Sequence, residues 1–160
     1  MSGENVFSAP MSEIYPVMKE VLDSGGSFRL VTAGNSMKPL LRDRRDTVIL
    51  ERPKDALKKF DILMYRRKNG AFVLHRLMKS DGDFFSMCGD NQRTFERGVC
   101  PEWVIARVTG IVRNGKTIDL QTSKKYCLYV FFWCRCFFLR QFCIFIRRGV
   151  LKIKRIFGGE

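Results

Sequence analysis

The sequence predicts a mainly β protein, in which a compact antiparallel β domain is flanked by a short N-terminal helix and an apolar, basic C-terminal helix. Short apolar or alternating runs separated by turn residues fill the stretch 27–121, and helical patterns occupy both ends. Of the 160 residues, 46% are hydrophobic and 28% charged, a globular composition that excludes a disordered or collagen-like chain. This length favours one domain with appendages.

Residues 1–26 are expected to form a helical lead-in. Ser12 is the predicted N-cap of a helix over 12–22, which ends at Gly25 and Gly26. One face of this helix collects the apolar residues Ile14, Val17, Met18, Val21 and Leu22. No basic region followed by an apolar run precedes the helix, so no secretory signal peptide is expected.

The β domain, residues 27–121, is predicted from seven short runs. These are 28–32, 47–50, 62–65, 72–77, 84–87, 104–112 and 117–120. Three dipeptides that favour tight hairpins, Asn69-Gly70, Asp81-Gly82 and Asn114-Gly115, lie between successive runs. Many short strands joined by such turns predict a compact, mainly antiparallel sheet.

Residues 122–160 are predicted to be a tail that associates with a membrane. They carry nine basic residues and one acidic residue, a large share of the net charge of +13. On a helix from residue 140 onward, one arc collects Phe142, Phe145, Ile146, Val150, Ile153, Ile156 and Phe157, and the other collects Arg140, Arg147, Arg148, Lys152, Lys154 and Arg155. This pattern favours a helix lying in the interface of an anionic membrane. The Phe-rich arc favours lipid over nucleic acid.

The position of the tail relative to the membrane follows from the same residues. Two arginines inside 126–146 disfavour a span, because each costs about 2.5–3.5 kcal/mol in hydrocarbon. The basic cluster 147–155 therefore favours a protein bound to the cytoplasmic face. If 126–146 did span, the β domain would lie on the extracytoplasmic side.

The chain offers few candidates for metal ligands or catalytic side chains. The six cysteines include no C-x-x-C pair, and the single histidine, His75, excludes sites that need two imidazoles, so no metal or cofactor is expected. Gly34 and Pro39 bracket a sharp turn that presents the Ser36 hydroxyl and leaves its backbone N–H unpaired. Ser36 needs a base to become a nucleophile, and His75 lies in the predicted strand 72–77.

Four short motifs follow one another along the β domain. They are Ser36-Met37-x-Pro39, 59–63 (KFDIL), 73–77 (VLHRL) and Gly89-Asp90-Asn91. In this order and spacing, the stretch 28–113 resembles the signal peptidase I family of serine peptidases, which has the self-cleaving LexA-type repressors among its relatives. The resemblance implies that family's β fold, with Ser36 as nucleophile and His75 as general base. It also implies that Asp90 orients or charge-stabilises His75.

A second carboxylate is an alternative for this last role. Eukaryotic-type relatives have a further Asp after the G-D-N motif, and the matching stretch here, 95–98, offers Glu96, so Asp90 and Glu96 both stay open. Arg76 is expected to form a structural ion pair with the G-D-N region, and Met37 to pack against the core or a bilayer. The Ser36 N–H is the expected first donor to an oxyanion, and no second donor is predicted.

Together these features predict a membrane-associated serine endopeptidase that resembles signal peptidase I. A neutral imidazole with an ordinary pKa near 6.5 accepts a proton at neutral pH, so the rate is expected to rise through pH 6–7. The peptide substrate, such as a leader or signal peptide, is expected to bind as an extended strand, and the resemblance implies small residues such as Ala before the cleaved bond. A self-cleaving regulator of the LexA type and a non-catalytic, basic membrane-binding module are the alternatives.

Overall fold

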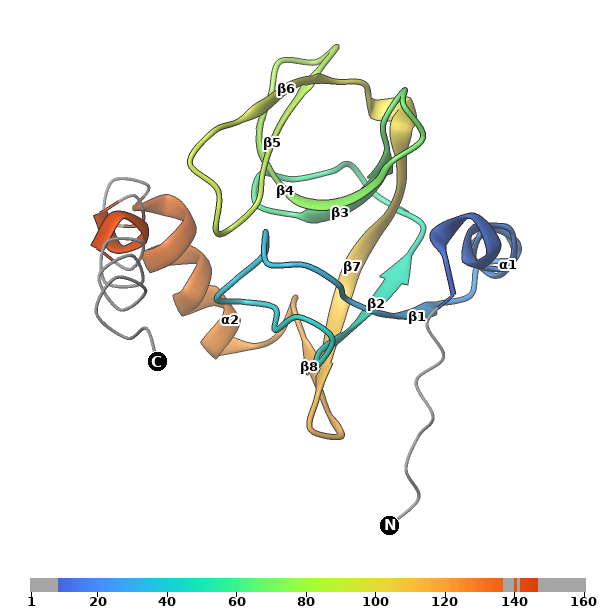
Figure 1. The fold of residues 1–160 in the computed structure, drawn as a ribbon, viewed down its shortest axis with the longest axis horizontal. Helices are drawn as coiled ribbons and strands as arrows, with labels where there is room; N and C mark the ends of the chain where they lie inside the picture. Colours follow the sequence, from blue (N-terminus) through green and yellow to red (C-terminus); the bar gives the residue numbers. More distant parts are fainter. Residues whose placement is uncertain (1–8, 137–139, 141, 147–160) are drawn as a thin grey trace, which may run out of the picture.

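The computed structural model describes residues 9–136, 140 and 142–146. Its centre is an eight-stranded antiparallel sheet (Figure 1). The strands are β1 (Phe28–Val31), β2 (Thr47–Glu51), β3 (Ile62–Arg66), β4 (Phe72–Ser80), β5 (Phe85–Cys88), β6 (Glu96–Val99), β7 (Val104–Arg113) and β8 (Lys116–Asp119). They are hydrogen-bonded in the order β1-β2-β7-β3-β4-β5-β6, and β8 pairs with β7. The mainly β, antiparallel prediction is confirmed.

The seven predicted runs all appear as strands, and the three predicted hairpin turns join β3 to β4, β4 to β5 and β7 to β8. Strand β6 was not predicted, because Glu96-Arg97-Gly98-Val99 has neither alternating polarity nor a β-branched run. This strand forms by pairing with β5, where Phe85 lies opposite Val99. Its position matters for the site, since it carries Glu96.

Helix α1 (Met11–Asp23) buries Met18 and Leu22 against the sheet. The predicted N-cap, Ser12, is wrong, because the helix begins one residue earlier and Pro10 takes the N-cap position without a side-chain hydrogen bond. The predicted stop is confirmed: Gly25 follows the helix with φ of +82°, a conformation that favours glycine.

Two hydrophobic clusters share strand β3, and this arrangement positions the site. Successive side chains of a strand point to opposite faces. Ile62 and Met64 therefore pack in the first cluster, with α1, β2 and β7, whereas Leu63 and Tyr65 pack in the second, with β4, β5 and β6. The neighbouring strand β4 pairs His75 with Leu63 and Arg76 with Ile62. His75 and Arg76 consequently lie on opposite faces.

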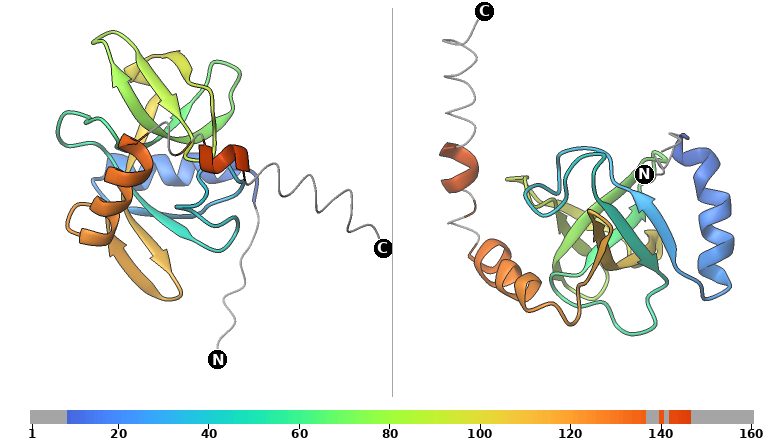
Figure 2. Two further views of the ribbon diagram at one scale, coloured as in Figure 1. Left: turned by 90° about the vertical axis from the view of Figure 1, so that its left-hand side faces the viewer. Right: turned by 90° about the horizontal axis from the view of Figure 1, so that it is seen from below.

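The described part of the C-terminal tail is helical. Helix α2 (Lys124–Tyr129) runs into a π-helical segment, η2 (Val130–Arg135), and residues 142–146 are helical again. Figures 1 and 2 show these helices on the side of the sheet opposite α1. Within the described ranges, no helix is long and apolar enough to cross a membrane. Residues 147–157 of the predicted amphipathic arcs lie outside the described residues.

Candidate active site

The Ser36 turn follows the edge strand β1. Gly34 has φ of +100°, which favours glycine, and its N–H donates to the Asp43 carboxylate at 2.7 Å. Met37, directly after Ser36, is buried in the first cluster, as predicted. Among the described residues, no acceptor bonds the Ser36 backbone N–H, so this donor is open for an oxyanion.

The Ser36 turn is held against the Gly89-Asp90-Asn91 turn. The Asn91 N–H donates to the Ser36 carbonyl oxygen at 2.7 Å, and the Asn91 side chain donates to the Asn35 carbonyl oxygen at 3.1 Å. A Cβ atom at position 89 would lie 2.6 Å from the same Ser36 oxygen, so only glycine permits this approach. The close approach of the two turns thus explains why the G-D-N motif begins with glycine.

The strand register brings this contact to the level of His75. Strands β4 and β5 pair Arg76 with Cys88, and continuing this register by one residue places Gly89 opposite His75. Side chains of opposite residues share a face. The contact between Gly89 and the Ser36 carbonyl oxygen therefore lies just beyond the end of β5, next to the strand that carries His75. The structure shows no hydrogen bond between the Ser36 hydroxyl and His75 among its described residues.

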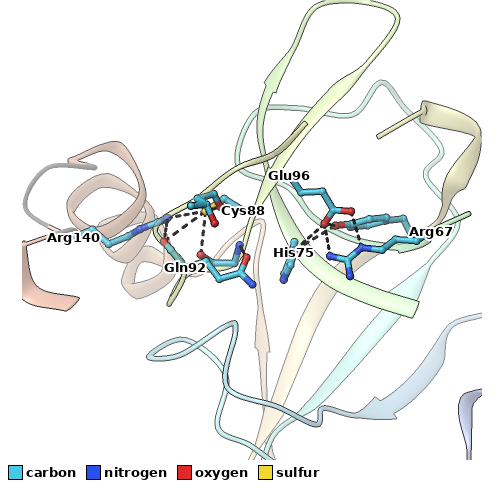
Figure 3. Close-up of polar contacts among 9 residues, drawn as sticks. Arg67, His75, Cys88, Gln92, Glu96 and Arg140 are labelled. Atoms are coloured by element: carbon cyan, nitrogen blue, oxygen red, sulfur yellow. Dashed lines mark hydrogen bonds and ion pairs between the residues drawn. The ribbon is translucent and has the colours of Figure 1, made fainter. Parts of the chain in front are cut away.

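His75 is 4% exposed and contacts a chain of polar side chains (Figure 3). Its Nδ1 lies 3.3 Å from the Tyr65 hydroxyl and 3.9 Å from Glu96 Oε2. The Tyr65 hydroxyl donates to Glu96 Oε2 at 2.6 Å. Arg67 in turn donates to both oxygens of Glu96, at 2.7 and 2.5 Å. Tyr65, His75 and Glu96 come from strands β3, β4 and β6, and Arg67 directly follows β3.

These contacts define which nitrogen of His75 carries the proton. Tyr65 has one hydroxyl hydrogen, and it is donated to Glu96; burial raises the pKa of Tyr65, so the phenol stays protonated. The contact between His75 and Tyr65 is then made by Nδ1–H donating to the phenolic oxygen. The Nε2 lone pair of His75 is left as the proton acceptor, as a general base requires.

Burial lowers the pKa of His75 to about 4, while the Glu96 carboxylate raises it and Arg67 lowers it further. Hydrogen bonds from Arg67 hold the pKa of Glu96 below its usual range, against the effect of burial. At neutral pH the site therefore contains a neutral imidazole beside an ionised carboxylate. The expectation of a rate that rises through pH 6–7 assumed the ordinary histidine pKa. With the lowered pKa of His75, a rate that depends on its neutral form should rise at a lower pH, near 4.

Asp90 lies elsewhere. Its carboxylate is fully buried and accepts two hydrogen bonds from Arg76, at 2.8 and 2.7 Å, and one from Tyr129 at 2.9 Å. The predicted ion pair of Arg76 with the G-D-N region is confirmed. Among the described residues the structure shows no hydrogen bond between Asp90 and His75, although the Asp90 charge raises the pKa of His75 as the Glu96 charge does. Glu96 Oε2 lies 3.9 Å from Nδ1 of His75, so Asp90 and Glu96 both remain candidates for the supporting carboxylate.

Burial makes the thiols of Cys88 and Cys134 poor nucleophiles. Cys88 is fully buried, and burial raises its pKa, as it raises that of Cys134 to about 12. The thiol form dominates for both at neutral pH, and thiolate is the reactive form. Cys88 instead contacts Arg140 of the C-terminal segment at 3.0 Å (Figure 3).

No cluster of three or more His, Cys, Asp or Glu suited to a metal ion occurs in the described part of the chain. Comparison with models of known protein families finds no match, and comparison with curated proteins finds no relative either.

Proposed function

We propose that the protein is a serine endopeptidase in which Ser36 is the nucleophile and His75 the general base, with a fold of the signal peptidase and LexA protease type. The single observation that carries this proposal is the chain Arg67–Glu96–Tyr65–His75, which holds the only histidine in the tautomer that a base needs. The motif resemblance and the contact between the Ser36 turn and the G-D-N turn support it.

In the proposed reaction, the Ser36 hydroxyl oxygen attacks the carbonyl carbon of the substrate while Nε2 of His75 takes its proton. The Ser36 N–H stabilises the oxyanion of the tetrahedral intermediate. His75 then returns the proton to the leaving amine. In the second half of the reaction His75 takes a proton from water, the water oxygen attacks the Ser36 ester, and His75 gives the proton back to the Ser36 oxygen. Glu96 stabilises the transient imidazolium, and Tyr65 fixes the ring between them.

The substrate is proposed to bind as an extended strand. Strand β1 is an edge of the sheet and ends five residues before Ser36. An edge strand offers unpaired backbone groups, so a peptide can add to it by main-chain hydrogen bonds and lead into the Ser36 turn. Recognition of a leader or signal peptide with small residues before the cleaved bond fits this mode.

The pH dependence of peptide hydrolysis tests the proposal. Because only the neutral imidazole accepts a proton, and the pKa of His75 is lowered to about 4, kcat/KM for an Ala-x-Ala peptide in detergent micelles should be level above about pH 6. It should fall tenfold per pH unit below about pH 4. A rate that still rises steeply between pH 7 and 9 would exclude His75 as the base. Absence of any hydrolysis would favour the non-catalytic module.

Tyr65 is a positioning residue, and the single histidine makes its role visible by NMR. With ¹⁵N-labelled histidine, the wild-type spectrum at pH 7 should show Nδ1 protonated. In Tyr65→Phe the Nε2-protonated form should appear, and kcat should fall about 10–100-fold with little change in KM, since an unpaired buried donor costs roughly 1–3 kcal/mol. Tyr15→Phe, which removes a hydroxyl at α1, is the control. An unchanged tautomer in Tyr65→Phe would contradict this role.

A further inference from the structure

The C-terminal helices have an inner and an outer face. The inner face, which packs on the β domain, consists of Tyr126, Tyr129, Trp133 and Arg140. The outer face consists of Leu128, Phe131, Phe132, Phe142, Phe145 and Ile146, which are between 47% and 64% exposed. The prediction from sequence placed Arg140 on the basic arc of an interfacial helix, whereas in the structure its side chain is fully buried.

The inner face makes hydrogen bonds to the turn at Gly89–Gln92, which in turn contacts the Ser36 turn. The Tyr129 hydroxyl donates to the Asp90 carboxylate at 2.9 Å, and the Trp133 indole N–H donates to the Asp90 carbonyl oxygen at 3.0 Å. Arg140 donates to the Gln92 carbonyl oxygen at 2.9 Å (Figure 3). The next contact is the hydrogen bond from the Asn91 N–H to the Ser36 carbonyl oxygen. A continuous set of contacts therefore joins the helices to the nucleophile turn.

The outer face fits an anionic lipid surface. Six large apolar side chains exposed between residues 128 and 146 are many for a monomer, and exposure of this kind marks an interaction site. Around them the described chain exposes Lys124, Lys125 and Arg135, and Arg135 lies over the Phe131 ring. The sequence has no acidic residue between Asp119 and Glu160. Apolar side chains that share their segment with exposed cations complement a bilayer with anionic headgroups, whereas an apolar protein partner would not require this charge.

We propose that anionic lipid binds the outer face and thereby orders the inner face on the Gly89–Asn91 turn, so that the nucleophile turn is held in place at the membrane. This inference rests on the proposed peptidase function for its catalytic part. The helices lose conformational entropy when they dock on the turn. Burial of the phenylalanines in lipid supplies free energy that offsets this loss.

Flotation with vesicles tests the surface. The full chain should float with equimolar phosphatidylcholine and phosphatidylglycerol vesicles and much less with phosphatidylcholine alone. The double variant Phe131→Ser/Phe132→Ser should partition at least about 100-fold more weakly, at about tenfold or more per buried phenylalanine. Phe84→Ser is the matched control, because Phe84 is 47% exposed but lies in the β4–β5 hairpin. Equal binding to neutral vesicles, or no effect of the double variant, would overturn the proposal, and self-association without lipid binding would point to a second copy instead.

Hydrogen exchange tests the coupling without relying on activity. Exchange of amides in the 89–91 turn should slow at least about tenfold when the wild type binds anionic vesicles. Tyr129→Phe should still float but lose this protection. Hydrolysis of a soluble Ala-x-Ala peptide should rise with the protection. Protection without hydrolysis under any condition would sink the proposed function alone, whereas binding without protection of the turn would overturn the coupling.

Discussion

Replacing either Ser36 or His75 with alanine is expected to lower kcat/KM for an Ala-x-Ala peptide by at least about 10³-fold. In the proposed mechanism Ser36 supplies the attacking oxygen and His75 takes its proton, so neither side chain is effective without the other. The double variant should therefore be no slower than either single variant, because the two side chains act as a unit. Steady-state hydrolysis at pH 7.5 in detergent measures all three.

The matched control is Ser86→Ala, which makes the same change in β5, the strand next to the one that carries His75. This variant should keep wild-type activity. Circular dichroism and urea unfolding establish that the variants remain folded. Additive losses in the double variant would contradict a shared step, and full activity of His75→Ala would leave Ser36 without its proposed base.

The second large effect is expected on stability. Asp90→Ala leaves the Arg76 guanidinium buried without its carboxylate, since both side chains are fully buried in the wild type. Removing one partner of a buried ion pair typically lowers the free energy of unfolding by about 3–5 kcal/mol. Urea unfolding at pH 7 should show a loss of this size, which is a large part of the roughly 5–15 kcal/mol that stabilises a domain.

Adding Arg76→Met to Asp90→Ala should recover more than half of the loss, because the unpaired charge is then gone. Asp23→Ala is the control: its ion pairs with Lys19 and Arg52 are exposed to solvent, so their loss should change the free energy of unfolding far less than Asp90→Ala does. A double variant as unstable as Asp90→Ala would show that the buried charge is not the cause.

The strands could be predicted because their signals are local. Apolar runs bounded by Asn-Gly and Asp-Gly turns indicate strands and hairpins without knowledge of the rest of the chain. Strand β6 has no such signal, since Glu96-Arg97-Gly98-Val99 is polar and becomes a strand only by pairing with β5. The carboxylate that approaches His75 lies on this strand, so its assignment needed the structure.

The motif residues of the candidate site could be predicted from the sequence, but the residues that contact His75 could not. Ser36, His75 and the G-D-N turn are visible in sequence, but Tyr65 reaches His75 diagonally across two strands, and this depends on the β3–β4 register. Alternation along β4 does place His75 and Arg76 on opposite faces. The burial of Arg140 has no local signal, because its contacts come from residues far away in sequence.

The most direct measurement is the mass of the enzyme during turnover. An Ala-x-Ala peptide is mixed with the full chain, the reaction is quenched in acid within the first turnovers, and the intact and digested protein are weighed by mass spectrometry. We predict an adduct equal to the acyl half of the peptide, attached by an ester to Ser36 and absent from Ser36→Ala. Peptide cleavage that continues in Ser36→Ala, or an adduct on a cysteine, would contradict the proposed chemistry.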